Sequence, residues 1–100
     1  MYNQIEKIKN VEQQVCDFFA LPIDDVFSKS TKREFTLARH FAIYLLHKNY
    51  EVSNNQLAKR YNCSWRNICY ICSNMDSYIK YDKKYKNYYN CLIQYIKKRE

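Results

Sequence analysis

The chain has 100 residues, which suffice for one hydrophobic core but not two, so we expect a single domain spanning residues 1–100. Its apolar content of 47% excludes an intrinsically disordered chain, and the absence of glycine with a single proline disfavours a sheet protein. Residues 1–27 contain two cations and five acids, a net charge of −3, whereas residues 28–100 contain fifteen cations and five acids, a net charge of +10. Such a basic region favours a polyanionic partner.

Apolar residues at steps of three and four predict a first helix from about residue 3 to 20. Pro22 ends this helix, because the residue before a proline disfavours the helical region. Residues 24–27 are expected to form a short turn or 3₁₀ segment. A hydroxyl-rich basic stretch, residues 28–33, follows it.

A central helix with a wide apolar face is expected from about residue 31 to 48, opened by a capping box of Thr31 and Glu34. In the last predicted helix, an apolar face turns inward and consists of Tyr85, Tyr88, Leu92 and Tyr95. This last helix is predicted over residues 82–98, and two further helices are predicted over residues 53–61 and 64–78. The chain is therefore expected to be all-α, a compact bundle of about five helices.

Four residues between 58 and 68 have the spacing of a helix-turn-helix. Ala58 is small where a second helix would cross, and four residues later Asn62 tolerates left-handed backbone geometry. Ser64 can cap the second helix, and Ile68, ten residues after the alanine, can lock the two helices together. The pattern favours a helix-turn-helix, with an ordinary antiparallel helix pair as the alternative.

The second helix of such a unit enters the major groove of DNA, where its early exposed residues meet base edges. The inward stripe expected for this helix is Ile68, Cys72, Met75 and Ile79. Arg66, Asn67 and Tyr70 are then left outward. Arginine pairs with guanine and asparagine with adenine, so these three are the predicted base-contacting residues, against the alternative of merely solvated polar side chains.

Two segments carry a resemblance to a known family: residues 27–33 (Phe-Ser-Lys-Ser-Thr-Lys-Arg) and 38–45 (Ala-Arg-His-Phe-Ala-Ile-Tyr-Leu). They resemble the C-terminal DNA-binding domain of the bacterial replication initiator DnaA, a Trp-repressor-like helix-turn-helix, and the similar order of elements extends over about residues 11–97. The resemblance implies binding of double-stranded DNA. It also implies contacts to the DNA backbone from Lys29, Thr31, Lys32, Arg33, Arg39 and His40. We further expect backbone contacts from Lys59, Arg60 and Ser64.

The chain departs from that family in its most recognisable segment. The family's Gly-Arg-Asp-His-Thr-Thr-Val run is replaced by residues 63–69, Cys-Ser-Trp-Arg-Asn-Ile-Cys. The residues that read the initiator's binding box are thus not carried over, and recognition of the same box is not expected. A Gly-rich phosphate loop is absent from the sequence as well, so we expect neither nucleotide binding nor any other cofactor.

Other kinds of site are disfavoured. Cys69 and Cys72 form a Cys-x-x-Cys pair, but zinc needs four ligands, and His40 and His47 fall on another predicted helix. No nucleophile or carboxylate arrangement accompanies the histidines, so we expect no metal site and no enzymatic activity. The five cysteines and the lack of a signal-peptide or membrane-spanning apolar run predict a cytoplasmic, nucleoid-associated protein with no membrane partner.

Sequence alone favours a DNA-binding regulator or accessory replication factor, and two alternatives remain. A protein-interaction module could keep the scaffold and use Trp65 and exposed tyrosines as its contact surface. Tyrosines 85, 88, 89 and 95 among lysines could instead stack single-stranded bases, although their helical spacing favours a core face. A module of this size reads only a short site, so tighter binding needs a homodimer or a protein partner.

Overall fold

The computed structural model describes residues 4–28 and 32–99, and over these residues it contains helices and no strands, which confirms the all-α class. The turn expected at residues 24–27 is a short α-helix, so the described residues form six helices. Their bounds are α1 (Gln4–Phe19), α2 (Ile23–Val26), α3 (Arg33–Asn49), α4 (Asn54–Arg60), α5 (Trp65–Tyr81) and α6 (Lys83–Arg99).

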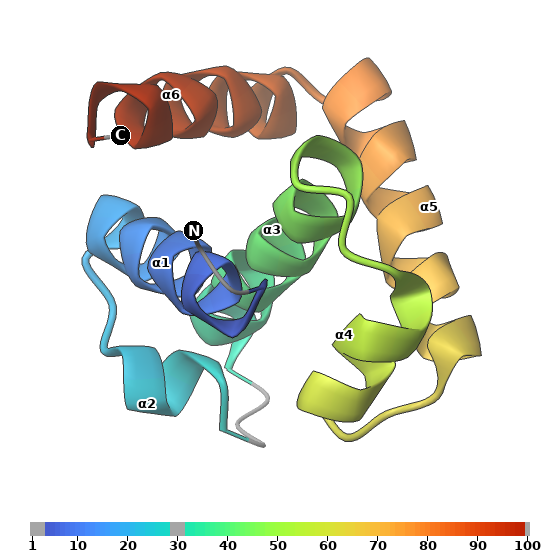
Figure 1. Ribbon diagram of the computed structural model, residues 1–100. Helices are drawn as coiled ribbons and strands as arrows, with labels where there is room; N and C mark the ends of the chain where they lie inside the picture. The colour runs from blue at the N-terminus through green and yellow to red at the C-terminus, as the bar shows by residue number, and fades with distance from the viewer. Residues whose placement is uncertain (1–3, 29–31, 100) are drawn as a thin grey trace.

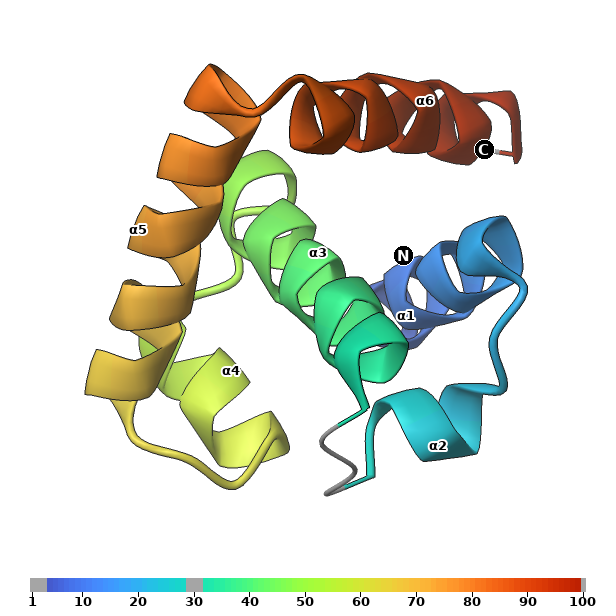
Figure 2. The same ribbon diagram turned by 180° about the vertical axis from the view of Figure 1, so that it is seen from behind.

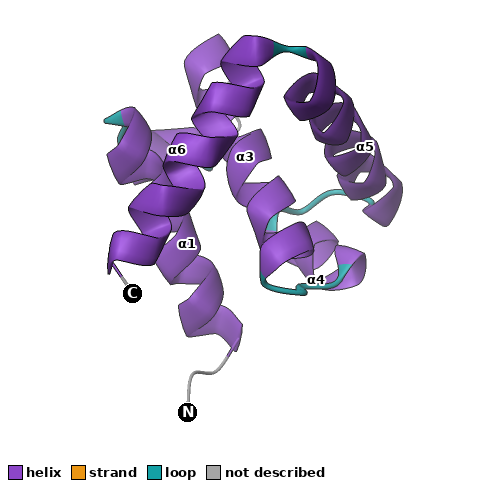
Figure 3. Cartoon of the chain, turned by 90° about the horizontal axis from the view of Figure 1, so that it is seen from above, coloured by secondary structure: helices purple, strands orange, loops and turns teal. Residues whose placement is uncertain are grey.

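Helix α3 runs through the middle of the molecule, and the other helices surround it (Figure 1). Helices α1 and α2 lie on one side of α3 and α4 and α5 on the other, as the reverse view also shows (Figure 2). Helix α5 leads at its C-terminal end into α6, which lies across that end of the molecule (Figure 3). The backbone measures 31 × 30 × 24 Å along its principal axes.

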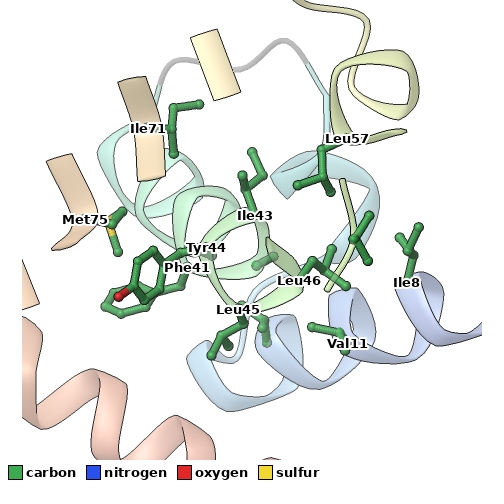
Figure 4. Packing of buried hydrophobic residues seen from close by; sticks show 14 of the residues in the cluster. Ile8, Val11, Phe41, Ile43, Tyr44, Leu45, Leu46, Leu57, Ile71 and Met75 are labelled. Atoms are coloured by element: carbon green, nitrogen blue, oxygen red, sulfur yellow. The ribbon is translucent and has the colours of Figure 1, made fainter. Parts of the chain in front are cut away.

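The hydrophobic core is built around the second half of α3. Residues 41–46 of this helix are all buried, because neighbouring helices cover it on several sides (Figure 4). Every other helix contributes to the same core, for example through Val15 of α1, Val26 of α2, Leu57 of α4, Met75 of α5 and Leu92 of α6. Full burial of one such aliphatic side chain contributes about 1.5–3 kcal/mol, so this cluster fixes the angles at which the outer helices pack.

The tyrosines of α6 face the core, as their spacing predicts. The ring of Tyr85 stacks on Phe41 of α3 with centroids 5.9 Å apart, and Tyr88 meets Phe19 of α1 at 5.6 Å. Tyr95 contacts Phe18 at 5.7 Å in the same edge-on manner. These half-buried rings therefore pack against aromatic neighbours on α1 and α3.

Among the described residues, three non-glycine positions take left-handed backbone geometry: Ala20, Glu51 and Asn62, with φ near +55°. Ala20 ends α1, where the amide of Leu21 donates to the carbonyl of Cys16 at 2.9 Å. The first helix thus stops on its own helix-ending motif, immediately before Pro22. A left-handed alanine costs roughly 1–2 kcal/mol.

The start of α3 differs from the prediction in one respect. The residue that caps the helix is Lys32, which makes no side-chain capping bond. The expected capping residue, Thr31, lies outside the described residues. A capping box is present at the start of α4, where the Ser53 hydroxyl accepts from the Gln56 amide and the Gln56 side chain accepts from the Ser53 amide.

Candidate nucleic-acid interface

Helices α4 and α5 form a helix-turn-helix with the four residues in the expected roles. Asn62 has φ of 54°, and the amide of Cys63 donates to the carbonyl of Ala58 at 2.9 Å. The hydroxyl of Ser64 accepts from the amide of Asn67 at 3.2 Å and so begins α5. Ala58 is only 8% exposed and Ile68 is fully buried, which lets the two helices pack closely at the turn.

The N-terminal turns of α5 present a polar face to solvent. Arg66 and Asn67 are exposed, and Tyr70 is 66% exposed. The opposite face packs against α3 and α4 through Ile68 and Met75. The structure therefore brings the three predicted base-contacting side chains together on one exposed face. The guanidinium of one of them, Arg66, lies over the indole ring of Trp65.

The only acidic residue of α5 is turned away from this face. The carboxylate of Asp76 accepts a hydrogen bond from the Tyr44 hydroxyl at 2.5 Å and pairs with Lys48 at 3.4 Å, both on α3. Burial, followed by the bond to Asp76, raises the pKa of Tyr44 above its ordinary value, so this phenol stays a donor. The outward face of α5 consequently carries no carboxylate to repel a polyanion.

Arg39, a predicted backbone contact, holds the described start of the basic stretch in place. Its Nε donates to the carbonyl of Val26 at 2.8 Å and its Nη2 to the carbonyl of Ser28 at 3.0 Å. Both carbonyls belong to the C-terminal end of α2 and the residues just after it. One arginine of α3 thus ties α3 to the chain that leads into the basic stretch.

Arg60, another predicted backbone contact, is engaged by a carboxylate that the sequence pattern alone did not single out. Its guanidinium donates twice to Glu12 of α1, at 2.9 and 2.6 Å, and the hydroxyl of Tyr61 donates to the same carboxylate at 2.6 Å. Glu12 is only 4% exposed. Arg60 therefore joins α4 to α1, and its charge is neutralised within the protein.

A sequence signal for Glu12 does exist. Glu12 lies four residues after Ile8, on the helix face formed by Ile8, Val11 and Val15, and these three apolar residues are all buried. An acid at such a position predicts a buried carboxylate with a partner. The partner itself, 48 residues away at Arg60, is not readable from the pattern.

The end of α2 and the helix-turn-helix lie on the same side of the molecule. The ring of Phe27, directly after α2, stacks on Tyr61 at the end of α4 with centroids 5.6 Å apart. An open groove of about 830 Å³ runs between them and is bordered by Ser28, Arg39 and Asn62. Figure 1 shows α2, the start of α3 and the α4–α5 turn along one edge of the molecule.

The remaining predicted contacts are placed less uniformly. Lys29 and Thr31 lie outside the described residues, while Lys32, Lys59 and Arg33 are exposed. Arg33 lies six residues before Arg39, about 120° away around the helix, and acts electrostatically on Tyr85 of α6. It thus occupies a different side of α3 from Arg39. His40 is half-buried, and burial, then the charge of Arg39, lowers its imidazole pKa below 6.5.

Two of the cysteines are buried thiols, and a third is a hydrogen-bond acceptor. Burial raises the pKa of the Cys16 and Cys72 thiols to about 11, and Cys69 accepts a hydrogen bond from the Asn54 side chain at 2.9 Å. Over residues 4–28 and 32–99, no three histidine, cysteine or acidic side chains gather closely enough to hold a metal ion. None of the helices within that range is both long and apolar enough to cross a bilayer.

The left-handed turn, the hydroxyl cap and the locked second helix define a helix-turn-helix domain. Residues 8–72 match the bacterial dnaA protein helix-turn-helix, and the chain belongs to that family. The match confirms the resemblance seen in the sequence and extends from α1 through the first turns of α5. No individually curated protein shows a significant match to the chain.

Proposed function

We propose that this protein binds double-stranded DNA by inserting the N-terminal turns of α5 into the major groove. The observation that carries the proposal is the shared exposure of Arg66, Asn67 and Tyr70 immediately after the Ser64 cap of a helix-turn-helix. Arg66 would donate to guanine and Asn67 would pair with adenine, while Tyr70 would contact the groove wall. Membership of the dnaA helix-turn-helix family supports this assignment.

The DNA backbone would be held on either side of α5. The proposed backbone contacts are Lys29, Thr31, Lys32, Arg33, Arg39, His40, Lys59, Arg60 and Ser64. Two of them act within the protein as well, because Arg39 anchors the residues after α2 and Arg60 is paired with Glu12. With five to seven cations at phosphates, the log–log dependence of affinity on salt would have a slope of about −4.5 to −6.

The cellular role we propose is that of a regulator or an accessory replication factor at the nucleoid, without catalytic activity of its own. A recognition helix that makes two specific base contacts gains roughly 1–3 kcal/mol of discrimination from each. A site this short gives limited selectivity. Pairing of two copies, or a protein partner at an adjacent site, would therefore set where on a genome the protein acts.

Selection from a pool of random duplexes, followed by a shift assay at two salt concentrations, tests the proposal. We expect an enriched short motif and a loss of affinity for it in Asn67→Ala. The matched control is Asn49→Ala, which removes the same exposed carboxamide from the C-terminal end of α3. No enriched motif, together with equal binding by the two variants, would refute base readout by α5.

A second candidate function, a protein-interaction module, is favoured by one observation. Trp65, at the start of α5, is 53% exposed, and Tyr81 at its other end is 79% exposed. Large aromatic side chains at the surface are typical anchors of protein interfaces. If this function is the right one, the affinity for duplex DNA will be weak and insensitive to both salt and Arg66→Ala, whereas Trp65→Ala will abolish partner binding.

A further inference from the structure

The outward face of α6 carries lysines and carboxamides and not a single acid. The exposed residues that recur along this face are Lys83, Lys86, Asn87, Asn90, Gln94, Lys97 and Lys98. None of the four lysines is joined to a carboxylate by an ion pair within the part of the chain that the structure describes. Asp82, the acid just before α6, accepts a bond from the Lys84 amide at 2.9 Å and so serves as a cap of the helix.

The inner face of α6 holds this row of lysines in one orientation. Leu92 is fully buried and Ile96 nearly so, and the rings of Tyr85 and Tyr88 contact Phe41 and Phe19. Rotation of α6 about its axis would expose these side chains to water. The lysines therefore point away from the core as a fixed feature of the fold.

Helix α6 and the α4–α5 turn lie at opposite ends of the molecule (Figure 1). The molecule extends about 30 Å along two of its axes, whereas charges in physiological salt are screened beyond about 8 Å. The lysines of α6 therefore contribute little attraction for a phosphate bound at the N-terminus of α5. Their charge serves a separate surface.

The length of the row suits a nucleic-acid backbone. From Lys83 to Lys98 the helix rises about 22 Å at 1.5 Å per residue. Phosphates on one DNA strand are about 3.4 Å apart along the duplex axis, and because the strand winds around that axis, a straight row of this length meets only a few of them. Lysine and amide side chains are donors that commonly contact phosphate oxygens without reading sequence.

We infer that the outer face of α6 is a second DNA-binding surface, which takes the backbone of another duplex without sequence preference. One chain would then hold two DNA segments at opposite ends. The contact between α6 and phosphates is inferred from the lysine row alone. The bridging of two duplexes rests in addition on the proposed function, since the first duplex is the one bound by α5.

A bridging assay with the full chain tests this inference. A biotinylated duplex is fixed on beads, the protein is added, and retention of a second, fluorescent duplex is measured across a salt series. The test variant is Lys83→Gln/Lys97→Gln. The control is Lys7→Gln/Lys9→Gln, which removes the same charge from α1. Because Lys7 donates to the carbonyl of Tyr50 at 3.4 Å, urea unfolding of this control is measured beside that of the test variant.

For Lys83→Gln/Lys97→Gln we expect several-fold lower retention of the fluorescent duplex and a salt slope reduced by about 1.8, the contribution of two phosphate contacts. Shift assays on a single duplex should change by less than about twofold, as should retention by the control. Retention equal to that of the unsubstituted chain overturns the inference. An equal loss in single-duplex binding also overturns it, because α6 and α5 would then contact one duplex.

Self-association of the protein could also bridge two duplexes, and sedimentation without DNA detects it. A dimer that the α6 substitutions dissolve would overturn the inference. The variant Arg66→Ala/Asn67→Ala reports on the proposed function instead. If it binds a selected single duplex as tightly as the unsubstituted chain, α5 readout fails, whereas loss of retention in the α6 variant alone still supports a second surface.

Discussion

Replacing Glu12 by glutamine tests how α1 is attached to the helix-turn-helix. The carboxylate accepts two hydrogen bonds from Arg60 and one from Tyr61 and is almost completely buried. Glutamine keeps the shape but loses the charge, and its amide nitrogen faces a donor. Because hydrogen bonds to charged groups contribute about 1.5–3 kcal/mol, we expect the free energy of unfolding to fall by about that amount.

Urea unfolding followed by circular dichroism measures this loss. At roughly 4–8 °C per kcal/mol for a domain of this size, the melting temperature in thermal melts should fall by about 6–24 °C. The control is Glu51→Gln, which removes an exposed carboxylate and should change stability by less than about 0.5 kcal/mol. A Glu12→Gln protein as stable as this control would refute the reasoning that the buried ion pair fastens α1 to α4.

Three other changes have defined outcomes. Burial lowers the pKa of His40 below its ordinary 6.5, so the unfolded chain binds a proton more readily than the folded one. The free energy of unfolding should therefore fall as the pH drops below about 6.5. In urea titrations at several pH values, His40→Gln should flatten that dependence. Ala20→Gly relieves a left-handed alanine and should raise stability by about 1 kcal/mol in thermal melts; a destabilised variant would contradict the assigned backbone geometry. Ser64→Ala removes the cap of α5 and should cost about 1 kcal/mol; an unchanged melting temperature would show that the cap contributes nothing.

Local backbone chemistry made the helix-turn-helix predictable from sequence. The roles of Ala58, Asn62 and Ser64 depend on neighbours within ten residues, so the sequence contains nearly all the information that the turn requires. The four residues of α2 are too few to show a helical period, which explains why a turn was expected there. The inward face of α6 was predictable because its period persists over several turns.

Long-range pairings were not predictable. The bond from Arg39 to the end of α2 and the pairing of Arg60 with Glu12 depend on how distant helices pack, and each residue looks in sequence like one more surface cation. The separation of Arg33 from Arg39, in contrast, follows from their six-residue spacing on one helix. The assignment of base and backbone contacts stays a prediction, since it concerns a partner rather than the fold.

The central claim is that α5 meets DNA at its N-terminal turns. The most direct measurement is an amide-shift titration of the isotopically labelled protein with a selected duplex, followed by NMR. We expect the largest shifts on residues 64–70 and on the described residues flanking the basic stretch, with α1 little changed. Shifts concentrated on α1, with residues 64–70 unaffected by duplex, would contradict it.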